Sequence, residues 1–186
     1  MKKYLLLSFA LMSVGLTSCG DDHDDENEEE LITTLVYTLT PTSGSPVVMT
    51  FKDIDGDGGK VPVITTSGPL KSGETYDGNL VLLNESVSPV DDITAEIKAE
   101  DEAHQFFFEV SGGLAGKMAI TYDDKDSDNN PIGLKTKVKP SGTGTGKLKI
   151  TLRHEPNKKA SGVVGGSITN AGGETDIEVS FDVEVK

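Results

Sequence analysis

Asp176-Ile-Glu-Val-Ser-Phe-Asp-Val-Glu-Val185, the stretch just before Lys186, alternates strictly between polar and apolar side chains. A period of two places successive side chains on opposite faces of a β-strand. The apolar residues from Ile177 onward then share one face, and the polar residues from Asp176 to Glu184 share the other. This pattern predicts a strand that lies on a hydrophobic core, with its charged face, Asp176 included, toward water.

The same alternation recurs along most of the chain after Leu31. In Lys147-Leu-Lys-Ile-Thr-Leu-Arg-His154 every second residue from Leu148 is apolar. Turn-forming clusters of Gly, Pro, Asn and Ser separate these segments, and short strands at such spacing are typical of a sandwich or barrel. We therefore predict an all-β fold, an antiparallel Ig-like β-sandwich of about eight to nine strands. The other expected strands are 32–40, 46–52, 61–66, 78–87, 105–111, 117–122 and 132–139.

One segment departs from the period of two. Residues 91–103 begin with two acids, contain good helix formers, and place Ile93 and Ile97 four residues apart. Acids favour the first turn of a helix, and a spacing of four puts both isoleucines on one face. The segment predicts one short helix that crosses between the two sheets.

The N-terminal 30 residues carry export signals instead of a core pattern. Lys2 and Lys3 precede an apolar stretch of 12 residues, Leu5–Leu16, which is too short to span a bilayer but suits a signal peptide. Leu16-Thr-Ser-Cys19 resembles a lipobox, and Cys19 is the only cysteine. We predict a signal peptide at 1–18, lipidation of Cys19, a tether at 19–30 and one domain at 31–186. The alternative is an ordinary signal peptide, or an uncleaved anchor, with an incidental cysteine.

The predicted tether is strongly acidic. Residues 20–30 hold eight acids and no apolar side chain, so the segment should stay extended and solvated. The net charge of −14 becomes −16 without Lys2 and Lys3, and −8 remains on 31–186 when the eight tether acids are set aside. This sign argues against nucleic acid and against adsorption to anionic lipid. It suits a monomeric head domain that attracts cations.

Two acidic loops suggest calcium. Asp53, Asp55 and Asp57 with Gly58 match the opening of a D-x-D-x-D-G calcium loop, in which alternate carboxylates converge on a hard cation. The EF-hand pattern then fails, because Ile64 stands where a bidentate Glu is needed. A weaker copy is formed by Asp124, Asp126 and Asp128. The alternative is that Asp and Gly simply form turns between strands.

Two histidines stand at the ends of expected strands. Strand parity places His154 on the face of Leu152, and His104 on the face of Phe106. Two such imidazoles could bind Zn²⁺ or Cu²⁺, or both axial positions of a haem. Glu102 or Glu155 could add a third metal ligand. The alternative is two unrelated histidines at the rim of the sandwich, because the sequence does not establish that they meet.

The sequence contains no catalytic signature, and we expect a protein that is not an enzyme. There is no G-x-S-x-G or H-E-x-x-H motif, and Gly142-Thr-Gly-Thr-Gly-Lys147 lacks the spacing of a phosphate loop.

Residues 154–166, with mixed charge and several glycines, are the least strand-like part of the second half of the chain. We predict that they form an exposed recognition loop.

Five segments resemble small Bacteroidota surface lipoproteins of largely uncharacterised function, which are often encoded beside TonB-dependent receptors. Some members are labelled type 1 periplasmic-binding-fold proteins, a label that implies a longer α/β chain and conflicts with the β alternation here. The resemblance implies a place on the outer membrane beside a nutrient receptor. The acidic run after Cys19 likewise resembles their surface-export signal, although a periplasmic location stays open. The five segments are 31–41, 51–59, 103–108, 152–158 and 170–176.

Two interpretations of function follow. The first is a surface-exposed, lipid-anchored binding protein that captures a metal ion or metal chelate for a TonB-dependent transporter. The second is a structural or adhesive surface lipoprotein with an Ig-like domain and no small-molecule ligand.

Overall fold

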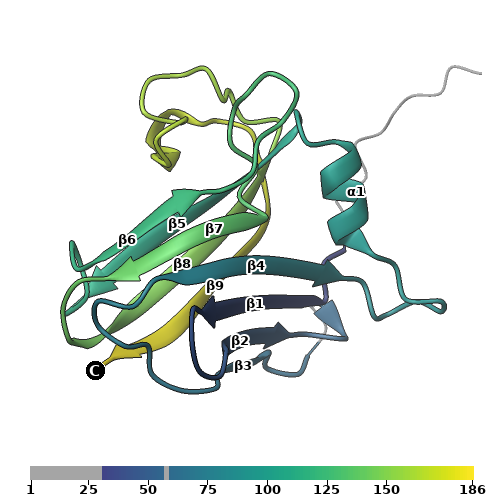
Figure 1. Cartoon of the computed structure of the whole chain (residues 1–186). Coiled ribbons are helices and arrows are strands. Elements are labelled where there is room, and N and C mark those ends of the chain that lie inside the picture. The colour runs from purple at the N-terminus through teal and green to yellow at the C-terminus, as the bar shows by residue number, and fades with distance from the viewer. Residues whose placement is uncertain (1–30, 57–58) are drawn as a thin grey trace, which may run out of the picture.

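The computed structural model describes residues 31–56 and 59–186, which form two packed antiparallel sheets (Figure 1). The six-stranded sheet has the order β3-β2-β1-β4-β7-β6, and the three-stranded sheet has the order β5-β8-β9. The predicted all-β sandwich is confirmed. The strands of the larger sheet are β1 (Thr34–Pro41), β2 (Val47–Lys52), β3 (Val63–Thr66), β4 (Tyr76–Leu83), β6 (Met118–Tyr122) and β7 (Lys135–Pro140). Those of the smaller sheet are β5 (His104–Gly112), β8 (Gly144–His154) and β9 (Glu174–Val185).

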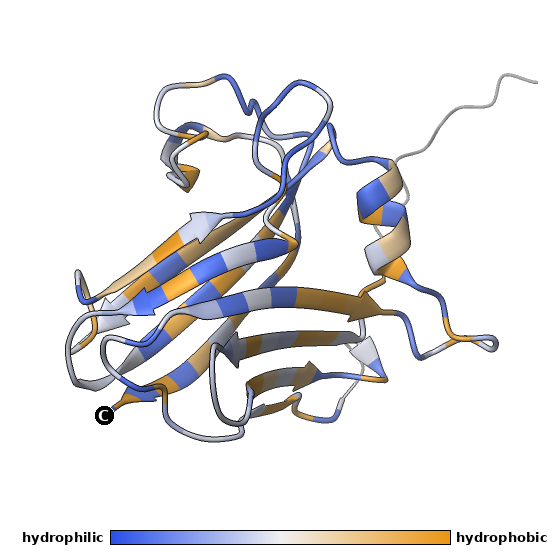
Figure 2. Ribbon diagram, viewed as in Figure 1, coloured by the Kyte–Doolittle hydropathy of each residue, from blue (hydrophilic) through white to orange (hydrophobic). Residues whose placement is uncertain are grey.

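Alternation of apolar and polar residues builds the core. Along β9 the buried residues run from Ile177 to Val185 in steps of two, and the colours of the strand alternate accordingly in Figure 2. They join one hydrophobic cluster with apolar residues of the larger sheet, such as Leu35 and Leu82. Burial of this apolar surface is the main favourable contribution to folding. The sequence pattern therefore accounts for both sheets and for the face that each presents to the core.

The predicted helix is confirmed but is shorter than 91–103. Helix α1 (Ile93–Ala99) connects β4 of the larger sheet to β5 of the smaller one. The carboxylate of Asp92 accepts a hydrogen bond from the Ala95 amide at 3.3 Å, which satisfies one free amide of the first turn. Ile93 and Ile97 are both buried, as their spacing predicts. A turn at residues 100–103 connects the end of the helix to His104, the first residue of β5.

The predicted recognition loop is partly wrong. Much of the segment between β8 and β9 folds back over the outer face of β5, and it includes the 3₁₀ turn η2 (Ile168–Asn170). Val163 is fully buried and clusters with Phe107 and Ala171. The side chain of Lys158 is only 5% exposed. Strand alternation does not foresee this, because Phe107 lies on the outer face and is covered by chain that is distant in sequence.

Candidate metal centre

The two histidines meet at one end of the smaller sheet. His104 begins β5 and His154 ends β8, and the two residues are directly opposite each other in the ladder. Their ring centroids are 4.6 Å apart and the rings are tilted by 38°. Paired positions on adjacent strands bring side chains of one face into contact. The sequence placed both rings on the core face, and the register now places them side by side.

A carboxylate from the third strand joins them. The ladder between β8 and β9 pairs Leu152 with Ile177 and Arg153 with Thr175, so that Asp176 is the extra residue of a β-bulge. A bulge inserts one residue and re-aims the side chains around it. The carboxylate oxygens of Asp176 lie 3.9 Å from His104 Nε2 and 4.0 Å from His154 Nδ1.

The prediction that Asp176 faces water is therefore wrong. Its side chain is only 3% exposed, whereas that of Asp182 on the same strand is 88% exposed. The physical reason is the bulge, because one extra residue shifts the inward and outward positions that strict alternation assigns. Asp176 thus leaves the charged outer face of β9 and turns toward the imidazoles.

The hydrogen bonding of His104 shows which of its nitrogens faces the cluster. Nδ1 lies 3.1 Å from the backbone carbonyl oxygen of Glu100, at the end of α1. A carbonyl only accepts hydrogen bonds, so Nδ1 carries the proton. In a neutral ring Nε2 then has a free lone pair. This Nε2 is buried and makes no hydrogen bond within the described part of the chain.

Burial lowers the pKa of His104 below its ordinary value of 6.5, and the charges of His154 and Lys158 lower it further. The carbonyl of Glu100 acts in the opposite direction but does not outweigh burial. The ring is therefore neutral at pH 7. A neutral imidazole with an unprotonated nitrogen is the form that binds a metal ion.

These three side chains form a donor set that suits a metal ion. Nitrogen atoms of His104 and His154 and a carboxylate oxygen of Asp176 lie within 4.8 Å of one another. Two imidazoles and a carboxylate are typical ligands of zinc and of other first-row transition metals. Zinc–ligand bonds of roughly 2.0–2.1 Å place neighbouring ligand atoms of a tetrahedron about 3.3 Å apart. Small shifts of these side chains therefore suffice to reach coordination distance.

The geometry favours an ion over a haem. A haem with two axial histidines must fit its macrocycle between the two rings. The rings of His104 and His154 are only 4.6 Å apart, a separation at which aromatic rings pack directly against each other. The carboxylate of Asp176 lies within 4.0 Å of a nitrogen of each ring. A bare ion needs none of the space that a porphyrin would require.

The third group beside the histidines is Asp176, not one of the two glutamates that the sequence suggested. The carboxylate of Glu102 accepts a hydrogen bond from the hydroxyl of Ser127. Glu155 follows His154 at a left-handed backbone position, with φ of 48°, and is exposed. Proximity in sequence pointed to these glutamates, but β pairing selects a residue from another strand.

The first acidic loop stays a prediction as a calcium site. Asp57 lies outside the described residues. Asp53 has one buried carboxylate oxygen without a hydrogen bond, and Asp55 accepts a hydrogen bond from the Lys60 amide at 3.2 Å. In the described residues the one group of three or more metal-binding side chains is the His104–His154–Asp176 cluster.

In the second acidic loop each carboxylate has different protein partners. Asp124 accepts hydrogen bonds from the amides of Gly133 and Lys135, while Asp128 contacts the ammonium group of Lys159 at 2.7 Å. Asp126 contacts the ammonium group of Lys158 at 2.9 Å, and the side chains of this pair are 1% and 5% exposed. These contacts divide the three carboxylates among separate partners and favour the turn interpretation of the loop.

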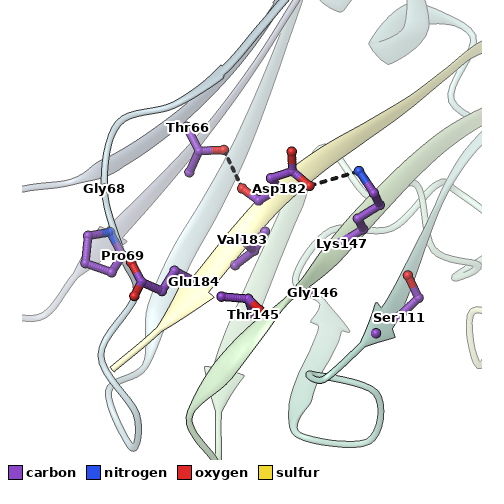
Figure 3. A pocket seen from close by; sticks show the side chains of 11 residues that line it. Thr66, Gly68, Pro69, Ser111, Thr145, Gly146, Lys147, Asp182, Val183 and Glu184 are labelled. Carbon is purple, nitrogen blue, oxygen red and sulfur yellow. Dashed lines mark hydrogen bonds and ion pairs between the residues drawn. The ribbon is translucent and has the colours of Figure 1, made fainter.

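A groove lies at the other end of the smaller sheet (Figure 3). It has a volume of about 750 Å³ and is bounded by the segment after β3 and by the ends of β5, β8 and β9. Its charged groups bind one another: Lys147 contacts the Asp182 carboxylate at 2.9 Å, and the Thr66 hydroxyl donates to the Asp182 carbonyl at 2.8 Å. Among the described residues, none that lines this groove has a buried side-chain polar atom without a hydrogen bond, so the histidine cluster is the stronger candidate site.

The predicted export signals lie outside the described residues, and this includes Cys19 and the tether at 19–30. No helix in the part of the chain that the structure describes has the length and apolar content to span a bilayer. No family model, curated protein or solved structure matched this chain. The function therefore has to be inferred from the side chains and their geometry.

Proposed function

We propose that this protein is a lipid-anchored protein of the outer-membrane surface that binds a divalent transition-metal ion for a TonB-dependent uptake system. The observation that carries the proposal is the cluster of His104, His154 and Asp176. Three segments that are far apart in the sequence converge there through strand pairing and a bulge. The ligand class is a borderline ion such as Zn²⁺ or Cu²⁺.

The state of His104 supports the metal assignment. A buried polar atom without a hydrogen bond costs about 1–3 kcal/mol. Nε2 of His104 is such an atom, and it faces a carboxylate that is too distant, at 3.9 Å, for a hydrogen bond. An ion between the two groups would remove this cost and would complement the negative charge of Asp176.

The cellular part of the proposal is supported by the sequence. The lipobox at Cys19 and the acidic run that follows it are the features on which surface anchoring depends. The net charge of −8 on residues 31–186 would raise the local concentration of cations near the head domain. A lipid anchor would hold the binding site beside a membrane receptor.

The competing interpretation is a structural or adhesive surface domain. The observation in its favour is burial, because the side chains of His104 and Asp176 are 0% and 3% exposed. In that case the cluster would be a pH-sensitive part of the core and would bind no ion. Metal binding separates the two interpretations directly.

The test is calorimetric titration of the purified protein with Zn²⁺ and with Cu²⁺. We expect one site that binds one ion and that weakens at least tenfold in His104→Ala, His154→Ala and Asp176→Asn. The matched control is Asp182→Asn, which removes an exposed carboxylate from the same strand and should leave this site unchanged. The His104→Ala/His154→Ala double variant corrects for weak binding by the acidic segment near Cys19. Equal binding by the double variant and the unaltered protein would disprove the metal site.

Cell location needs a separate measurement. We expect radiolabelled palmitate to enter the unaltered protein but not Cys19→Ser. Protease added to intact cells should cleave the anchored protein if it faces the exterior. Cells that carry the His104→Ala/His154→Ala variant should accumulate less zinc than unaltered cells when a chelator limits its supply. Equal accumulation would remove the uptake role and leave metal binding in place.

A further inference from the structure

The cluster offers three protein ligands, one fewer than a closed structural zinc site. Closed sites in proteins have four protein ligands, whereas open sites have three and a water molecule. Within residues 31–56 and 59–186, His104, His154 and Asp176 form a group to which no further His, Cys, Asp or Glu belongs. The nearby glutamates at 102 and 155 are not part of it.

The side of the cluster that could stay open is that of His154. The side chain of His104 is 0% exposed and that of Asp176 is 3% exposed, but that of His154 is 15% exposed. His154 is therefore the member of the cluster that solvent reaches most.

The backbone beside His154 also leaves no room for a side chain at position 173. Gly173 has a φ of 69°, and a Cβ added to it would lie 2.1 Å from the carbonyl oxygen of His154. Gly172 precedes it with a φ of 63°. Left-handed positions of this kind favour glycine. Gly173 itself therefore offers no side chain that could complete the coordination, and Glu174, which pairs with His154 in the ladder, is exposed and is not part of the group of metal-binding side chains.

We propose that an ion in this site keeps one coordination position open on the His154 side and accepts an exchangeable ligand there. This inference rests on the proposed metal binding. With two imidazoles and one carboxylate as ligands, a divalent ion keeps a net charge of +1. The open position therefore prefers an anionic or nitrogen donor. Such a donor could come from a metal chelate or from a protein that receives the ion.

An open position makes release a ligand exchange. An incoming donor can bind the ion before the bonds to the protein break, so release should depend on the concentration of the acceptor. A site with four protein ligands must first lose one of them, and its release becomes independent of acceptor concentration. The difference can be measured with the same purified protein that tests metal binding.

Cobalt provides the spectroscopic probe. Co²⁺ is added to the purified protein until its visible bands saturate, and azide or imidazole is then titrated. We expect the bands to shift to a new limit with one added ligand per ion, with no loss of bound cobalt after gel filtration. The control is Asp182→Asn, which should give the same shift. Free Co²⁺ under the same conditions gives the reference spectrum.

The second measurement is the rate at which a coloured chelator removes Zn²⁺. We expect the rate to increase in proportion to chelator concentration. Bound cobalt with an unchanged spectrum, or a rate that does not depend on chelator, would overturn the open position and leave the metal site standing. Failure of Co²⁺, Zn²⁺ and Cu²⁺ to bind at all would instead overturn the proposed function, and this inference with it.

Discussion

The ion pair between Lys158 and Asp126 provides a quantitative test of the structure. The ammonium group contacts the Asp126 carboxylate at 2.9 Å and also the backbone carbonyl of Asp101. It therefore ties the segment after β8 both to the end of α1 and to the second acidic loop. The neighbouring pair of Lys159 and Asp128 has a contact of 2.7 Å, but its side chains are 74% and 53% exposed.

These burials predict different costs for the same substitution. Lys158→Met leaves a buried carboxylate without its cation, and breaking such a pair costs about 3–5 kcal/mol. Lys159→Met removes an exposed pair, which contributes about 0–1 kcal/mol. In a domain of this size each 1 kcal/mol lowers the melting temperature by roughly 2–4 °C. We expect losses of about 6–20 °C for Lys158→Met and at most about 4 °C for Lys159→Met.

A third variant separates charge from packing. In Lys158→Met/Asp126→Asn the asparagine still accepts the hydrogen bond that the Asn130 amide donates to Asp126 at 2.8 Å, but no buried charge remains. It should therefore recover much of the stability that Lys158→Met loses. The stability of all three variants is measured by urea and thermal unfolding, with circular dichroism as the signal. Equal losses in Lys158→Met and Lys159→Met would refute the reasoning.

Two further predictions follow, one from the same ion pair and one from the packing around Gly78. Burial raises the pKa of Asp126, but hydrogen bonds from Lys158 and Asn130 outweigh it, and the pKa falls below 3.8. The ionised Asp126 carboxylate therefore stabilises the fold above pH 3.8, and this stabilisation is lost below that pH. The difference in unfolding free energy between Lys158→Met and the unaltered protein, measured in urea, should become smaller from pH 7 to pH 3. A difference that stays constant over this range would contradict the prediction. Gly78→Ala should cost about 1–3 kcal/mol in the same assay. Its Cβ would lie 2.6 Å from the Tyr37 hydroxyl, whereas Gly68→Ala, which meets open space, should cost little; equal costs would contradict the packing.

The fold could be predicted because its signal is local. Alternation along β9 and β8 identifies the strands and their inward faces, and the spacing of Ile93 and Ile97 identifies the helix. The order of the strands could not be predicted in this way. It depends on pairing between segments that are far apart, such as β1 with β4, and many pairings are compatible with the same alternation.

For the candidate site as well, the local features could be predicted from the sequence and the contacts between distant segments could not. Parity placed His104 and His154 on the core side, but only the register shows that they are opposite each other. The third side chain of the cluster, Asp176, was missed because proximity in sequence suggested Glu102 and Glu155. The burial of Lys158 was missed as well, because a lysine in a segment that is expected to be a loop is normally exposed to solvent.

Asp176 shows why the site could not be found by extending the strand pattern. In a regular ladder it would share the outer face with Glu178 and Asp182, where a carboxylate costs little. The bulge removes it from that face, and burial of a carboxylate is expensive unless nearby groups compensate for it. Bulges are over-represented beside active sites, where they re-aim a side chain. The bulge, which belongs to the pairing of β8 with β9 and not to the alternation within β9, is therefore what brings Asp176 to the two histidines.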